Sequence, residues 1–157
     1  MSRIPVLLAV LVAAASVVAV AGATSGRTVA GATVVIRHQV QHCHAWSVNG
    51  NAFAAAQRLS VERGATVTFV DDDVMPHRLV ELAGARVAMR NGSTMPMGMG
   101  MGGSSAAGEM SSMGATTSIR LTKPGVYRFR TRAGEDYRSG FETTGKDNVL
   151  TLTVTVR

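Results

Sequence analysis

Alternating polar and apolar residues predict β-strands along most of the chain. In residues 65–70 Thr66 and Thr68 alternate with Val67 and Phe69, and Val149–Val156 alternates just as regularly. A period of two is typical of a strand with one buried face. Similar patterns predict further strands at residues 33–40, 58–61, 78–82, 116–122 and 126–131. Turn residues such as Asn49-Gly50-Asn51 separate the strands, so we expect about seven strands in an all-β Greek-key sandwich.

The first residues have a different pattern. Residues 4–22 are apolar and uncharged, follow Arg3, and end in Ala21-Gly22-Ala23. This pattern predicts a signal peptide at residues 1–23, cleaved after Ala23, with an uncleaved helical membrane anchor as the alternative. We therefore expect an extracytoplasmic protein with a flexible lead-in at residues 24–32 and one domain at residues 33–157. Membrane contact is expected only if the anchor is kept.

The charge of the chain is basic but dispersed. It carries 16 Lys and Arg against 10 Asp and Glu, a net charge of +6. The basic residues alternate along strands, as in Arg128 and Arg130, and do not form a cluster with interleaved aromatics. This distribution argues against nucleic acid as a partner and leaves an acidic redox or metal-transfer protein as a partner.

Side chains that can bind a metal ion are concentrated in His42, Cys43 and His44. These three residues include the single cysteine and two of the four histidines. Thiolate and imidazole bind late first-row metals readily, and one cysteine cannot form an internal disulfide. A buried, inert cysteine is the alternative. His77 follows Pro76 at the start of a predicted strand, where a rigid backbone suits a ligand. We expect a metal site of Cys43, His44 and His77, with His42 as a fourth candidate.

Other polar residues are weaker candidates. Glu135 lies in the long loop at residues 132–147, and His38 fits a strand surface better than a metal site. Trp46 is expected to pack beside the site. Asp71, Asp72 and Asp73 lack the spacing of a calcium-binding loop and are expected to form a solvated turn.

Residues 91–114 interrupt the strand pattern with six methionines among Gly, Ser and Ala. They have no amphipathic spacing and little bulk for a core, which predicts a mobile Met-rich insertion outside the core. Thioethers are soft ligands that favour Cu(I), so either Cu(I) capture or a plain linker fits this segment.

Three segments together resemble the cupredoxin family of copper proteins, which includes plastocyanin and azurin. Residues 64–70 with Met75-Pro76-His77 are similar to the strand and first histidine ligand of that family. Residues 124–129 resemble its late strand, and Val149–Val156 its last strand. The late strand of the family ends in a copper-binding cysteine followed by His and Met, whereas this chain has Thr131 and no such residues after it. The resemblance therefore implies a copper site in which Cys43 and His44 join His77 from rearranged positions.

The expected function is that of an exported copper-binding protein, active in electron transfer or in copper handling. Copper is the expected cofactor and zinc the alternative, because the same residues bind both. A metal-free or zinc-binding scaffold is the alternative function. Catalysis by the thiolate is less expected, because no orienting third residue or oxyanion-hole motif accompanies it.

Overall fold

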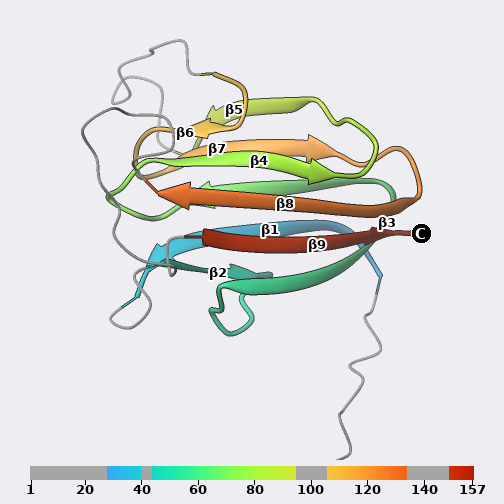
Figure 1. Ribbon diagram of the computed structural model, residues 1–157, viewed down its shortest axis with the longest axis horizontal. Coiled ribbons are helices and arrows are strands. Elements are labelled where there is room, and N and C mark those ends of the chain that lie inside the picture. The colour runs from blue at the N-terminus through green and yellow to red at the C-terminus, as the bar shows by residue number, and fades with distance from the viewer. Residues whose placement is uncertain (1–27, 40–43, 95–105, 134–148) are drawn as a thin grey trace, which may run out of the picture.

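The computed structural model describes residues 28–39, 44–94, 106–133 and 149–157. These residues form nine β-strands, which hydrogen bonds join into one sheet with both parallel and antiparallel pairs (Figure 1). In chain order the strands are β1 (Val29–His38), β2 (His44–Val48), β3 (Ala56–Asp71), β4 (His77–Ala83), β5 (Met89–Ser93), β6 (Glu109–Met110), β7 (Ala115–Arg120), β8 (Gly125–Ala133) and β9 (Val149–Val156). The prediction of an all-β fold is therefore confirmed. The expected signal or anchor segment lies outside the described residues, and no described helix has the length and apolarity to cross a bilayer.

The long strand β3 connects two layers. Its first part, up to Val61, pairs in parallel with β9, and its second part, from Thr66, pairs with β1 and β7. The change of partner occurs around Gly64, which has a φ of 89°. A positive φ is readily available to glycine, so the strand bends there without a steric penalty. The sequence predicted two strands separated by a turn at this point, and the structure has one bent strand.

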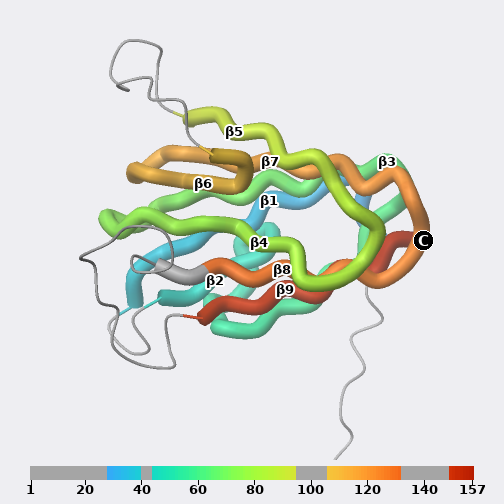
Figure 2. Tube along the Cα trace, turned by 45° about the horizontal axis from the view of Figure 1, so that its top comes forward, coloured from blue at the N-terminus to red at the C-terminus, as the bar shows by residue number. Residues whose placement is uncertain are grey.

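The two layers follow from these pairings. One contains β2, β1, the second part of β3, β7 and β5, and the other contains the first part of β3, β9, β8, β4 and β6. The tube in Figure 2 shows β1, β7 and β5 on one side and β4, β8 and β9 on the other. Alternate side chains of each layer point into the space between them.

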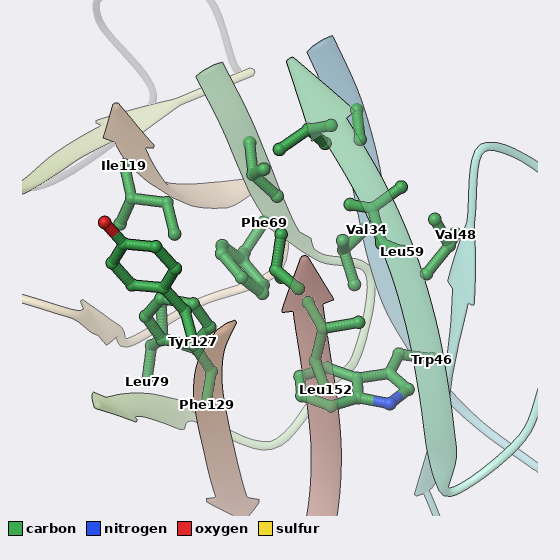
Figure 3. Close-up of a cluster of buried hydrophobic side chains, with 14 of the residues drawn as sticks. Val34, Trp46, Val48, Leu59, Phe69, Leu79, Ile119, Tyr127, Phe129 and Leu152 are labelled. Carbon is green, nitrogen blue, oxygen red and sulfur yellow. The ribbon is translucent and has the colours of Figure 1, made fainter. Parts of the chain in front are cut away.

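The core fills the space between the layers with large apolar side chains. Phe69 of β3 lies between Trp46 of β2 and Phe129 of β8, with ring centroids 6.2 and 6.0 Å away (Figure 3). Burying such side chains contributes roughly 1.5–3 kcal/mol each, so this core holds the layers together. Trp46 is fully buried, as expected of a packing residue.

Three strands were not predicted: β2, β5 and β6. β2 is buried on both faces, so its sequence does not alternate. Met110 of β6 is fully buried in the core, although the Met-rich segment was expected to lie outside it. Residues 95–105 of that segment lie outside the described residues.

Candidate metal centre

Polar residues continue the core-facing rows of β1 and β2 at one end of the sandwich. Val34 and Ile36 are buried on β1, and His38 follows on the same face; on β2, His44 shares the face of Trp46. His38 and His44 are paired directly across the two antiparallel strands. Their ring centroids are 5.5 Å apart, with His44 buried and His38 exposed. The strand register thus joins a buried imidazole to one at the surface.

His77 approaches the same place from the other layer. It begins β4, and its ring centroid lies 5.1 Å from that of His44. The His77 side chain is fully buried, and neither of its ring nitrogens has a hydrogen-bond partner within the described residues. Buried polar atoms nearly always have partners, so an imidazole without one needs a specific reason. A metal ion bound to a ring nitrogen supplies such a reason.

Asp73 lies between the two buried histidines, on the connection that carries the chain from β3 to β4. Its Oδ2 is 2.6 Å from Nδ1 of His44 and 3.6 Å from Nε2 of His77, which is beyond normal hydrogen-bond length. Its Oδ1 accepts a hydrogen bond from the backbone N–H of Met75. Asp73 is 1% exposed, so its carboxylate belongs to the interior of the site.

The charge state of Asp73 follows from these contacts. Burial on its own raises the pKa of Asp73, but the hydrogen bonds from His44 and the Met75 backbone, together with the nearby His77 ring, outweigh burial and hold it well below its usual value. An ionised carboxylate only accepts hydrogen bonds, so Nδ1 of His44 donates. This fixes the tautomer of His44 and leaves Nε2 as the nitrogen with a lone pair for a metal.

His77 has the protonation state that a metal ligand requires. Its burial lowers the pKa, with the nearby His44 acting in the same direction and Asp73 opposing it. A neutral imidazole is the form that binds metal ions. His77 is therefore neutral and free to coordinate around neutral pH.

Asp71 is a second buried carboxyl at this end of the molecule. Burial raises its pKa to about 8, helped by the charges of Asp73 and Asp72 and opposed by hydrogen bonds from the backbone at Asp73 and His77. Asp71 is therefore neutral at pH 7. Only Asp72 fits the expected solvated turn, since it pairs with Arg37 at the surface. For Asp71 and Asp73 that prediction was wrong, because both continue the core-facing side of the chain.

The donor atoms of His38, His44 and Asp73 all lie within 4.8 Å of one another. His77 lies beside this group rather than within it, with its Nε2 3.6 Å from Oδ2 of Asp73. Imidazole suits copper, zinc, iron and nickel, and the carboxylate adds a negative charge that attracts a cation. Among the described residues, the arrangement can therefore hold a metal ion.

A soft donor lies on a neighbouring strand. Met110 of β6 is paired directly with His77 of β4, and both side chains are fully buried. Directly opposed residues of antiparallel strands project to the same side, with Cβ atoms about 4.5–5.5 Å apart. The Met110 side chain therefore projects to the same side of the sheet as the His77 imidazole. On the other side of β4, Thr131 of β8 is buried opposite Leu79. Thr131 is the residue that stands where the resembled cupredoxins have their copper-binding cysteine.

The sequence identified part of this centre. His44 and His77 were both chosen as ligands, and the structure brings their rings together. Cys43, His42 and Glu135 lie outside the described residues, so their roles stay predictions. Asp73 was missed as a contributor, and His38 was considered only as a weaker candidate. A usable signal existed for Asp73, because it stands four residues before His77 and two after Asp71, which continues the buried row of Val67 and Phe69.

The comparisons with known proteins give distant similarities. No protein-family model and no curated protein matches the chain. Among solved structures, a Cu(I) form of an amicyanin variant has 16% identity and a TM-score of 0.40, covering 80% of this chain and 82% of its own. A purple cupredoxin from Nitrosopumilus maritimus has 15% identity and a TM-score of 0.40, covering 79% and 99%.

A cysteine protease inhibitor from Entamoeba histolytica is similar to the same degree. It has 8% identity and a TM-score of 0.42, covering 81% of this chain and 97% of its own. Because the scores are low and the proteins differ in function, these similarities do not assign the chain to a family.

Proposed function

We propose that the protein is an exported copper-binding protein with a cupredoxin-like Greek-key sandwich. Its copper site consists of His44, His77 and Cys43, and Asp73 holds His44 in place through the hydrogen bond to Nδ1. The observation that supports this most strongly is His77, a buried neutral imidazole without a hydrogen-bond partner in the described residues, 5.1 Å from a second buried imidazole. Cys43 precedes His44 directly in the sequence and supplies the thiolate.

Copper is favoured over zinc by the soft donors near these imidazoles. Thiolate and thioether ligands select copper, and Met110 is the strand partner of His77. Zinc is the second candidate, because the carboxylate of Asp73 beside two imidazoles also matches the donors that zinc accepts. His42 and Glu135 remain candidates for a further ligand in either site.

Two roles fit a copper protein of this kind, and neither requires catalysis. Electron transfer needs ligands held by a rigid frame, which strands β2 and β4 supply at their first residues. Copper handling needs access from solvent, and exposed His38 next to buried His44 supplies an outer imidazole. A redox or copper-accepting protein is the expected partner in both roles.

The extracytoplasmic location is part of the proposal and rests on the sequence of residues 1–23. Expression of the full chain in a bacterium, followed by mass spectrometry of the periplasmic fraction, tests it. A product beginning at Thr24 is expected; a full-length product retained in the membrane fraction supports the anchor instead.

Copper binding is tested by titrating the purified protein with Cu(II) and recording the visible spectrum. The wild type is expected to bind one equivalent with an intense thiolate-to-copper band. Cys43→Ser should lose the band, and His77→Gln should lose or strongly shift it. Asp72→Asn, a surface change one residue from Asp73, is the matched control and should keep it. Failure of the wild type to bind stoichiometric Cu(II) rejects the proposal, and tight colourless zinc binding supports the second candidate.

The Met-rich segment is proposed to capture Cu(I). Replacing Met95, Met97, Met99 and Met101 by Leu should lower the number of Cu(I) ions bound and leave the Cu(II) band unchanged. Met113→Leu, a single exposed methionine, is the control. An unchanged Cu(I) count in the fourfold variant removes this role.

A further inference from the structure

The opposite end of the sandwich from the histidines contains a hollow of about 540 Å³. It lies where the β4–β5 connection passes the end of β7 and the start of β8, the same end as the C-terminus (Figure 2). The two ends are separated by the length of the strands, since β3 runs from Thr66 in the hollow to Asp71 near the histidines. Small-molecule sites in proteins commonly have volumes of about 300–1,000 Å³, so the hollow is large enough for a ligand.

The charged residues that line the hollow are all basic: Arg86, Arg90, Arg120 and Lys123. None of them forms a salt bridge with an acidic residue in the parts of the chain described here. Arg120 donates from Nε to the backbone carbonyl of Gly64, which holds its side chain but leaves its charge uncompensated. Four like charges around one hollow repel one another, and an anion placed among them relieves that repulsion.

An apolar wall accompanies the charges. Ala85, Val87 and Ala88 of the β4–β5 connection line the hollow, as do the core residues Ile119 and Tyr127. The carboxylate of Glu81 accepts a hydrogen bond from the backbone N–H of Val87 and so helps to hold this wall in place. The hydroxyl of Tyr127 donates to the carbonyl of Lys123 and fixes the turn that carries the lysine. Contacts within the protein therefore hold both the wall and the turn in place.

We propose that this hollow binds a small organic anion, a carboxylate or sulfonate with an apolar or aromatic body. The guanidinium and ammonium groups bind the anionic end through charge-assisted hydrogen bonds, and the wall of Ala85, Val87 and Ala88 covers the apolar body. A concave site of this volume fits such a ligand better than the flat face of a partner protein. The proposal is independent of metal binding, because the hollow shares no residue with the candidate metal centre.

Naphthalenesulfonate is a suitable probe, titrated into the isotope-labelled full-length chain while backbone amide shifts are recorded by NMR. We expect one site with a dissociation constant below about 1 mM and shift changes centred on residues 85–90 and 118–123. Arg86→Gln combined with Arg120→Gln should weaken binding about tenfold or more. Arg58→Gln combined with Arg78→Gln removes two exposed charges outside the hollow and should leave binding unchanged.

Two comparison ligands separate the contributions of charge and apolar body. Naphthylmethylammonium, which has the same rings with a positive charge, should not bind, and inorganic sulfate should bind at least about tenfold more weakly than the probe. The proposal fails if the cation binds as well as the anion, if both double variants behave alike, or if the shifts map outside the hollow. It also fails if sulfate matches the probe, because the wall then contributes nothing.

Discussion

Asp73 is the residue on which the two buried histidines depend. Its carboxylate is buried and ionised, accepts a hydrogen bond from His44 and lies 3.6 Å from His77. An ionised buried group is tolerated only when its neighbours compensate its charge. Asp72, the next residue back, forms its salt bridge with Arg37 at the surface instead. The two aspartates therefore offer a direct comparison between a buried and an exposed carboxylate.

Asp73→Asn is expected to destabilise the protein by about 2 kcal/mol, because His44 then loses its hydrogen bond to an ionised carboxylate in a buried site. Asp72→Asn is expected to cost less than about 1 kcal/mol, as is usual for an exposed ion pair. Urea unfolding of the metal-free protein measures both. Equal effects of the two substitutions would contradict the central position given to Asp73.

The raised pKa of Asp71 makes stability depend on pH. In the unfolded chain Asp71 titrates near pH 4, whereas in the folded protein its pKa is about 8. Between these values the folded state binds the proton and the unfolded state does not, so the contribution of Asp71 to stability is present below pH 4 and is lost as the pH rises to 8.

Asp71→Asn replaces the neutral carboxyl by a neutral amide that does not titrate. The free energy of unfolding of the variant, minus that of the wild type, should therefore increase from pH 4 to pH 8, by up to about 1.4 kcal/mol per pH unit. Denaturant unfolding of both metal-free proteins at several pH values gives this difference. A difference that stays constant with pH means that Asp71 keeps an ordinary pKa.

The short strand β6 contributes to both the core and the surroundings of His77, although it has only two residues. It adds Met110 to the core and places it opposite His77 on β4. The sequence around it is low in complexity and lacks the alternation of polar and apolar residues from which a strand is predicted. The strands that were predicted, such as β9, have regular alternation and one buried face.

Met110→Ala should destabilise the protein by about 2–5 kcal/mol, since it empties a core position. Met113→Ala should cost less than about 0.5 kcal/mol because Met113 is 44% exposed. Met110→Leu keeps the volume and should cost less than about 1.5 kcal/mol, while shifting the copper spectrum through the loss of sulfur. Thermal or urea unfolding with the Cu(II) spectrum checks all three. A Met110→Leu spectrum identical to wild type would show that the thioether does not influence the metal.

Across the whole molecule, both layers contribute to the candidate centre. His44 comes from the layer of β1 and β2, His77 begins β4 in the other layer, and Asp73 lies on the connection between them. His44 and His77 could be chosen as ligands from the sequence because imidazole side chains commonly bind metal ions. Asp73 was not chosen and His38 was given a low rank, because their proximity to the other histidines depends on strand register and on the crossing of the chain between layers. Such contacts between distant residues are not encoded in local periodicity.

We propose that one copper ion joins the two layers through His44 and His77. The most direct measurement is a crystal structure of the copper-loaded protein with anomalous difference density recorded at the copper absorption edge. We expect one strong peak bonded to ring nitrogens of His44 and His77, with Cys43 as a third ligand. A peak elsewhere, or one held at the surface by His38 without His77, would contradict it.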